Sequence, residues 1–204
     1  MKTSKDNNFS LPTFSHTSIS SSTWALPLTP CQIPELKISC YGCCGRNFKS
    51  KEEVNRDLKI NTKDFNSIKH PTQYKMLLFR DRLNPNPDVV TPSGLCSNVV
   101  QFNSTCTACP LHPLINKLIE KKKYNFPFNK QKHSSRQRDP RFGYCDMNYE
   151  CATFKYYAKF NDIQRREFVK WVIKQQFDNY TYSMKNGDNV LIHEFAKATN
   201  KIID

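Results

Sequence analysis

Glycine is scarce in this chain, and its scarcity excludes a first class of folds. Five of the 204 residues are glycine, whereas nucleotide-binding folds depend on glycine-rich loops that let the backbone approach phosphates. The sequence contains neither G-x-G-x-x-G nor G-x-x-x-x-G-K-[ST], and it lacks the H-E-x-x-H pattern of zinc peptidases. We therefore expect no enzyme of these three classes.

Long apolar runs are also missing. Hydrophobic residues make up 38% of the chain, and the longest uninterrupted runs are too short to cross a membrane. Near the amino terminus the most apolar piece is residues 24–28, which is too short and too proline-broken for the core of a signal peptide. We therefore expect a protein of the reducing cytoplasm with no membrane partner. In that compartment cysteines serve as metal ligands more often than as disulfides.

Cysteine, in contrast, is abundant, with nine residues of which three lie within five positions. The adjacent Cys43 and Cys44 cannot form an ordinary disulfide without strain. Two C-x-x-C pairs, Cys40/Cys43 and Cys106/Cys109, have the spacing that lets two sulfurs face one ion across a tight turn. The candidate metal ligands are the eight cysteines in the middle of the chain: Cys40, Cys43, Cys44, Cys96, Cys106, Cys109, Cys145 and Cys151.

Eight thiols exceed the four that one zinc ion or one iron–sulfur cluster requires. There are then either two metal sites, or one cluster with further thiols nearby. The surplus, the aromatic neighbours and the Cys109-Pro110 pair favour iron, because proline often follows the last ligand of a ferredoxin loop. We predict a [4Fe–4S] cluster, with zinc as the alternative. A third interpretation is that the cysteines are ordinary buried thiols, which behave as small hydrophobic residues.

The order of these cysteines resembles a known family. A CxxCC motif, a helix start of the KSKEEV type, an isolated cysteine, a short hairpin and a cysteine before a proline-rich turn are similar to the cysteine-cluster domains regarded as zinc or iron chelators. The same cluster occurs in flagellin lysine-N-methylases. The family's first motif usually holds four cysteines and this one holds three, so the resemblance implies a ligand from Cys145 or Cys151 instead. The matching positions, within residues 40–115, are Cys40, Cys43, Cys44, Cys96, Cys106 and Cys109.

Two segments differ in composition from the rest. Residues 1–30 are rich in Ser and Thr and contain three prolines, so we expect a disordered tail. Residues 31–204 are expected to form a single cysteine-rich domain. Within it, residues 117–141 carry nine Lys or Arg against two acidic residues, which is more than half of the net charge of +13. Such a segment indicates a polyanionic partner, commonly nucleic acid, or else a solvated basic loop.

This basic segment supports an alternative function of a different class, a zinc-stabilised module that binds nucleic acid. In that hypothesis the metal only folds the chain, lysines and arginines contact phosphates, and Tyr124, Phe126 and Phe128 stack on bases. The phosphate-contacting residues would be Lys121, Lys122, Lys123, Lys130, Lys132, Arg136, Arg138 and Arg141.

The remaining sequence favours an α+β fold that is mostly helical, with one small β-hairpin and irregular cysteine-rich loops drawn together by a metal site. Capping boxes predict helices beginning after Ser50 and after Asn161, the first with a second turn starting near Asn61 or Thr62. Residues 95–102 and 105–110 read as a hairpin around the turn at 103–104. Further helices are expected at 73–83, at 113–122, from Cys151 to about 159, and after 186–188.

This arrangement predicts that the first loop, the hairpin and a helix start converge. Cys106 and Cys145 complete the eight candidates, whereas Cys31 is expected to stay outside with the tail. The sequence contains no paired carboxylates in a defined setting, so it assigns no catalytic residue, and the predicted role is redox chemistry or support of an unidentified reaction. The sulfurs expected in one neighbourhood are those of Cys40, Cys43, Cys44, Cys96, Cys109 and Cys151.

Overall fold

The computed structural model describes residues 26–27, 29–33, 36–69, 73–82, 90–104, 106–112, 145–146 and 148–200. About half of these residues are helical, and the strands form two separate antiparallel pairs. The expected α+β class is therefore confirmed. The predicted helix at 113–122, the basic segment 117–141 and most of the tail 1–30 lie outside the described residues.

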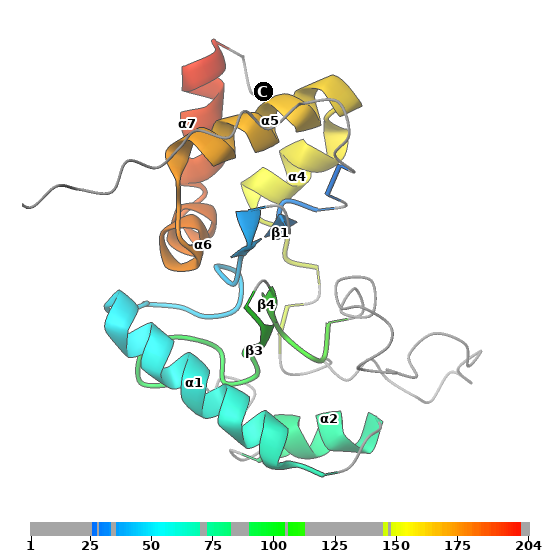
Figure 1. Ribbon diagram of the computed structural model, residues 1–204, viewed down its shortest axis with the longest axis vertical. Helices are drawn as coiled ribbons and strands as arrows, with labels where there is room; N and C mark the ends of the chain where they lie inside the picture. Colours follow the sequence, from blue (N-terminus) through cyan, green and yellow to red (C-terminus); the bar gives the residue numbers. More distant parts are fainter. Residues whose placement is uncertain are drawn as a thin grey trace, which may run out of the picture.

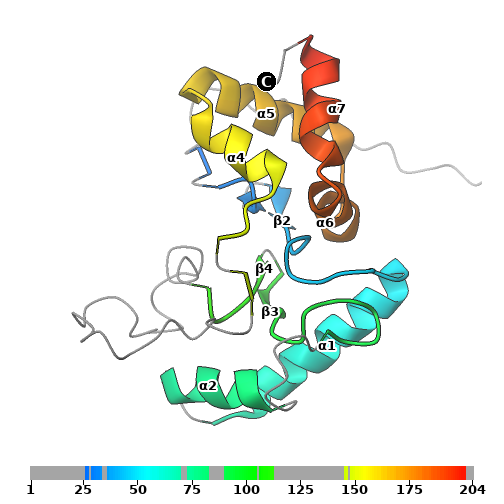
Figure 2. The ribbon, with the colours of Figure 1, turned by 180° about the vertical axis from the view of Figure 1, so that it is seen from behind.

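Two lobes make up the described structure, and they lie one above the other in Figures 1 and 2. The helical lobe contains α4 (Ala152–Lys159), α5 (Asp162–Gln175), α6 (Asn179–Gly187) and α7 (Val190–Thr199), together with the strand pair β1 (Gln32–Ile33) and β2 (Ile38–Ser39). The hairpin lobe contains α1 (Lys51–Ser67), α2 (Gln73–Asp81) and the strand pair β3 (Val100–Asn103) and β4 (Cys106–Ala108).

The core of the helical lobe is built from aromatic residues at helical spacing. The predicted capping box at Asn161 is present and starts α5, whose Phe168 and Val172 lie one turn apart and are fully buried. Phe168 meets Phe195 of α7 edge to face, with ring centroids 5.3 Å apart. Edge-to-face pairs add stability beyond their buried area. This packing fixes α4, at whose start Cys151 lies, against α5 and α7.

The hairpin lobe is organised by α1. Its capping box at Ser50 is also present, and Val54, Leu58 and Phe65 form the buried face. The restart predicted near Asn61 is absent, because α1 continues without a break to Ser67. The predicted hairpin is confirmed as β3 and β4, which pair in antiparallel register across a bulge.

Buried polar side chains join the two lobes where β2 meets β4. The Ser39 hydroxyl accepts a hydrogen bond of 3.0 Å from the Thr107 backbone amide, and the Gln32 side-chain amide donates to the Thr107 carbonyl at 3.0 Å. The Ser39 hydroxyl in turn donates to the Gln32 side-chain oxygen at 2.8 Å. Because each of these groups is buried and has a partner, the contact fixes the register of the lobes.

Two elements of this joint were not predicted. The sequence predicts one hairpin, whereas the structure has a second strand pair, β1 and β2. In this pair Gln32 lies opposite Ser39 and Ile33 lies opposite Ile38. It also has α6, to which the backbone amide of Ser39 is tied by a 2.9 Å hydrogen bond to the Asn179 side chain. Both elements frame the cysteine-rich loop that runs between the lobes.

Candidate metal centre

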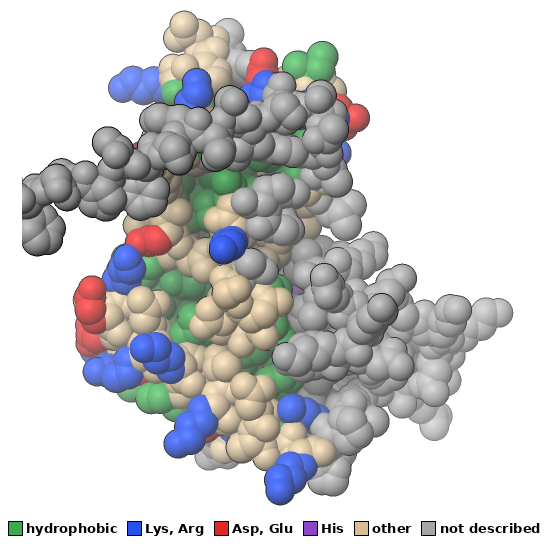
Figure 3. Space-filling model, in the orientation of Figure 1, with side chains coloured by type: hydrophobic (Ala, Val, Ile, Leu, Met, Phe, Trp, Pro, Cys, Tyr) green, Lys and Arg blue, Asp and Glu red, His purple; other side chains and the backbone are tan. Residues whose placement is uncertain are grey.

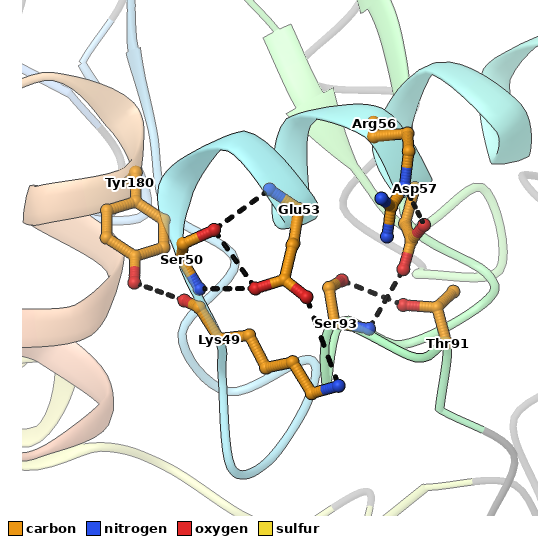
Figure 4. A network of polar contacts seen from close by, with 8 residues as sticks. All are labelled: Lys49, Ser50, Glu53, Arg56, Asp57, Thr91, Ser93 and Tyr180. Atoms are coloured by element: carbon orange, nitrogen blue, oxygen red, sulfur yellow. Dashed lines mark hydrogen bonds and ion pairs between the residues drawn. The ribbon is translucent and has the colours of Figure 1, made fainter.

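The cysteine-rich loop between β2 and α1 is held at both ends by polar contacts, of which Figure 4 shows those at the far end. At its far end the Tyr180 hydroxyl of α6 donates to the Lys49 carbonyl at 2.5 Å, next to the capping box of Ser50 and Glu53. At its start the Tyr41 amide donates to the Ser183 hydroxyl of α6 at 3.0 Å. The loop is therefore tied to α6 near both of its ends.

The facing loop, residues 91–96, is fixed by α1. The backbone amide of Ser93 donates to the buried carboxylate of Asp57 at 2.9 Å, and the hydroxyls of Thr91 and Ser93 lie 3.0 Å apart (Figure 4). Gly94 follows in a left-handed conformation with φ of 86°, and a Cβ there would overlap the Arg46 carbonyl. This close approach lets the two loops run antiparallel.

Antiparallel pairing of the loops brings Cys96 beside Cys44. The Cys96 amide donates to the Cys44 carbonyl at 2.7 Å, and Gly45 and Leu95 form a β-bridge one residue further on. Two thiols separated by about fifty residues in sequence thus become neighbours on adjacent backbones.

Within the first motif a tight turn gathers three thiols. The Cys44 amide closes the turn by donating to the Tyr41 carbonyl at 2.8 Å, and the Gly42 amide donates to the Cys40 sulfur at 3.4 Å. The sulfurs of Cys43 and Cys44 lie 3.8 Å apart. Backbone amides that donate to sulfur stabilise thiolates and tune metal centres.

Cys31 lies beside Cys40, so the prediction that it stays apart from the other cysteines with the tail is wrong. It lies directly opposite Cys40 at the end of the β1–β2 ladder, and the Cys40 amide donates to its carbonyl at 2.8 Å. The chain ahead of it also contacts the helical lobe, since Pro30 accepts a 2.8 Å hydrogen bond from the buried Tyr182 hydroxyl. A sign of this hairpin is visible in the sequence, where Ile33 and Ile38 flank a turn symmetrically between the two cysteines.

Cys151 approaches the site as the N-cap of α4, as predicted. Its sulfur accepts a 3.4 Å hydrogen bond from the Phe154 amide. Cys109 lies in the loop after β4, where its carbonyl accepts a 3.0 Å hydrogen bond from the His112 amide, and it influences the pKa of Cys44. Electrostatic influence thus links the 40–44 loop with Cys96, Cys109 and Cys151, and the shared metal site stays a prediction.

Two of the predicted ligands, Cys106 and Cys145, lie in other surroundings than the cysteines described above. Cys106 is only 4% exposed and packs with Phe65, Phe79 and Phe102 in the core of the hairpin lobe, where burial raises the pKa of its thiol to about 11. It has the surroundings of a small hydrophobic residue. Cys145 is exposed on the segment that leads to Cys151.

All nine cysteines are thiols. Seven of them form what we call the central thiol group, defined by backbone pairing, sulfur contact or electrostatic influence between its members. It consists of Cys31, Cys40, Cys43, Cys44, Cys96, Cys109 and Cys151.

The thiols of this group differ in pKa. Burial, and then the nearby Cys43 and Cys151, raise the pKa of Cys31 to about 12, and burial likewise raises the pKa of Cys40, Cys96 and Cys151. The exposed Cys43 differs, because a hydrogen bond from the Cys44 thiol lowers its pKa to about 7. The first thiolate of the group therefore forms at Cys43, and its charge disfavours ionisation of the others.

A soft cation would favour the thiolate form of all these cysteines, because it replaces their protons and cancels the repulsion between the thiolates. In the described part of the chain no three His, Cys, Asp or Glu side chains already stand in a metal-binding arrangement. The donor chemistry nevertheless fits. Two thiolates on a tetrahedral zinc ion with Zn–S bonds of about 2.3 Å lie about 3.8 Å apart, which is the separation of the Cys43 and Cys44 sulfurs.

Comparison of the chain with protein-family models, with curated protein sequences and with solved structures gives no match. The resemblance to chelating cysteine-cluster domains thus stays a prediction from the cysteine spacing. None of the described helices is long and apolar enough to cross a lipid bilayer. The function of the site is therefore inferred from the chemistry of its cysteine thiols.

Proposed function

We propose that this protein binds a metal centre through thiolates of the central thiol group. The observation that carries the proposal is the convergence of seven cysteines from separate segments, among them β1, the 40–44 loop, the 91–96 loop and the start of α4. Buried thiols that raise one another's pKa bind protons at neutral pH and exchange them for a soft metal. We place this chemistry in a reducing cytoplasm, where the thiols stay available.

Two kinds of centre are candidates. An iron–sulfur cluster, which the ligand surplus and the Cys109-Pro110 pair predict, would give the protein a redox role or the support of an unidentified reaction. Zinc is favoured by the 3.8 Å sulfur separation at Cys43 and Cys44 and would act structurally. Either centre, when bound by thiolates of the helical lobe and of the hairpin lobe, would hold the two lobes together.

The test is metal analysis of protein purified anaerobically without chelators. Iron with labile sulfide and absorbance near 400 nm would identify the cluster, and zinc with a colourless spectrum would identify the ion. Substitution Cys40→Ser should lower metal content and stability together, because metal binding and folding are coupled. Protein that contains neither metal, and takes up neither on reconstitution, would rule out the proposed function.

A polyanionic partner, with nucleic acid as the leading case, is a second candidate function. It is supported by the charge of residues 117–141 and by the exposed Lys59 and Lys63 of α1. Figure 3 shows basic side chains over α1 and α2. Binding through phosphates weakens steeply as salt rises, by counterion release. Fluorescence anisotropy with RNA and DNA oligonucleotides from 50 to 200 mM salt tests this, and binding that is absent at low salt contradicts it.

A further inference from the structure

Cys43 and Cys44 form a vicinal dithiol whose two sulfurs are in contact. In an extended chain neighbouring side chains point to opposite faces, which would keep two adjacent sulfurs apart. Here the backbone turns at residues 41–44, and the Cys44 amide closes the turn by donating to the Tyr41 carbonyl at 2.8 Å. The two sulfurs consequently lie 3.8 Å apart. To form a disulfide bond of about 2.05 Å they need to approach each other by only about 1.8 Å.

The two thiols differ in their access to solvent. Cys43 is exposed, whereas Cys44 is half-buried and packs against the hydrophobic cluster that contains Tyr41 and Leu95. A thiol within reach of a small oxidant, next to a second thiol that can complete a disulfide, is the arrangement found in redox-sensing cysteines. In this pair Cys43 would react first and Cys44 second.

Cys40 is the other candidate partner of Cys43, because the two form a C-x-x-C pair, a spacing used by disulfide-forming proteins. Its side chain, however, packs against the hydrophobic core of the helical lobe, and its sulfur accepts a 3.4 Å hydrogen bond from the Gly42 amide. Cys40 and Cys44 thus pack against different hydrophobic clusters, and the sulfur of Cys44 touches that of Cys43.

We propose that Cys43 and Cys44 are a reversible oxidation site, at which a small-molecule disulfide of the glutathione type converts the two thiols into a vicinal disulfide. The Cys43 sulfur attacks one sulfur of the oxidant, and the first small thiol leaves with the proton of Cys43. The Cys44 sulfur then attacks the Cys43 sulfur of this mixed disulfide, and the second small thiol leaves with the proton of Cys44. One S–S bond breaks and one forms, so the two protein sulfurs lose two electrons and the two oxidant sulfurs gain them.

The product is easily reduced, because it is strained. The Cα atoms of adjacent residues are about 3.8 Å apart across a trans peptide, below the range of about 4.4–6.8 Å that is usual in disulfides. Strained and exposed disulfides are the labile ones, whereas structural disulfides resist reduction by glutathione. The dithiol should therefore return when the reduced form of the small thiol predominates again.

Oxidation also removes two sulfurs from the central thiol group. The oxidation site itself needs no metal, and only this effect rests on the proposed function. Because the thiolate is the form of cysteine that binds metal, protein with a disulfide at Cys43 and Cys44 should bind less metal than the reduced protein.

Peptide mapping tests the site. Full-length protein, reduced and freed of metal, is incubated under argon with a glutathione buffer in which the oxidised form predominates, and the remaining thiols are then blocked with iodoacetamide. Cleavage after Lys37 and Arg46 releases peptide 38–46, which contains Cys40, Cys43 and Cys44. We expect this peptide to carry one alkyl group, on Cys40, and to have lost two hydrogens from the vicinal pair. After return to reduced glutathione it should carry three alkyl groups.

Variants identify the two steps. Cys44→Ser should stop at the mixed disulfide and keep one glutathione group on Cys43. Cys106→Ser is the matched control, since Cys106 lies in the hydrophobic core of the hairpin lobe, and it should still form the vicinal disulfide. A disulfide between Cys40 and Cys43, a mixed disulfide that persists in the unaltered protein, an unmodified pair, or a vicinal disulfide that reduced glutathione does not open would each overturn the assignment.

Zinc binding measured before and after oxidation separates this inference from the proposed function. Loss of zinc binding on oxidation, with recovery in reduced glutathione, supports both. A vicinal disulfide in a protein that takes up neither zinc nor iron contradicts the proposed function and leaves the oxidation site standing. A metal-binding protein in which the pair stays unmodified contradicts the oxidation site alone, and oxidised protein that binds as much zinc as reduced protein contradicts the effect on metal binding.

Discussion

At Gly42 the missing side chain lets the cysteine-rich loop lie directly on the backbone of α6. A Cβ at this position would overlap the carbonyl oxygen of Ser183 and would come within 2.9 Å of the Gly187 amide nitrogen. The neighbouring Tyr41 is 1% exposed and donates its amide to the Ser183 hydroxyl. The position of the thiols between the lobes thus depends on one residue without a side chain.

We predict that Gly42→Ala destabilises the protein by about 1–3 kcal/mol, the usual cost of overfilling a packed contact. Metal content should fall as well, because the loop must leave α6 to make room. Urea denaturation with metal analysis on the same samples measures both effects. The control is Gly187→Ala, whose added Cβ would lie 3.1 Å from the Gly42 carbonyl and needs only a small shift. Equal effects of the two substitutions would contradict the explanation.

At the level of elements, α1 positions the 91–96 loop through one buried carboxylate. Burial alone would raise the pKa of Asp57, but hydrogen bonds from Ser93 and Thr91 outweigh it and hold the pKa below its usual value. Asp57 is 4% exposed, and it accepts the Ser93 amide at 2.9 Å. The charge that orders this loop is therefore present at neutral pH.

We predict that Asp57→Asn costs about 1–3 kcal/mol at pH 7, the range for weakening a buried hydrogen bond to a charged group. A carboxyl with a lowered folded-state pKa contributes stability above its unfolded pKa of about 3.9, and this contribution is lost as the pH falls through the folded value. The difference between the urea midpoints of variant and parent should therefore be constant from pH 7 to about pH 5 and shrink as the pH falls below about 4. The exposed Glu52→Gln serves as control, and a difference that does not shrink below pH 4 would contradict the assignment.

Local rules explain which elements could be predicted from the sequence. The helix starts at Ser50 and Asn161 follow from capping boxes, and the hairpin of β3 and β4 follows from a change of period around a turn. Cys151 was correctly placed at the start of a helix. For the site, the cysteine spacing, the hairpin and the helix start predict that six of the seven cysteines in the central thiol group share one neighbourhood, and their joint binding of a metal stays a prediction.

The missed elements depend on tertiary contacts. Helix α6 has the sequence NYTYSMKNG, in which most residues are weak helix formers. It is stabilised by burial of Tyr182, Ser183 and Asn186 against the rest of the helical lobe and the cysteine-rich loop. Strands β1 and β2 have two residues each and persist because both sides are covered. Since Cys31 directly precedes β1, its position beside Cys40 could not be derived from local propensity.

For the whole molecule, the central thiol group lies where the two lobes meet. Cys31 and Cys40 flank the β1–β2 pair and Cys151 caps α4 in the helical lobe, whereas Cys96 and Cys109 flank the hairpin. Each lobe has a hydrophobic cluster of its own, and a third cluster, in which Leu95 and Val99 pack with Tyr180 and Met184 of α6, joins them together with buried hydrogen bonds. A metal bound by thiolates of both lobes would strengthen the coupling of their unfolding.

We predict that metal-loaded protein unfolds in one thermal transition, and that chelator-treated, reduced protein unfolds at lower temperature in two. Differential scanning calorimetry separates these cases, and amide hydrogen exchange identifies the lobe that opens first. Buffer with chelator already saturated by zinc is the control for chelator effects. An unchanged single transition after metal removal would show that the lobes are coupled without it.

The pairing of Cys31 with Cys40 also has a consequence for synthesis on the ribosome. Cys151 is translated about 120 residues after Cys31, which at about 5–20 residues per second is a delay of about 6–24 s. During this interval β1 and β2 have neither α6 nor the aromatic core to pack against, and their two thiols are part of an unfolded nascent segment. Cys44, Cys96 and Cys109 emerge earlier, together with α1 and the hairpin, so the backbone pairing of Cys44 with Cys96 can form while the chain is still being made. The thiols of the hairpin lobe can thus come together before those of the helical lobe.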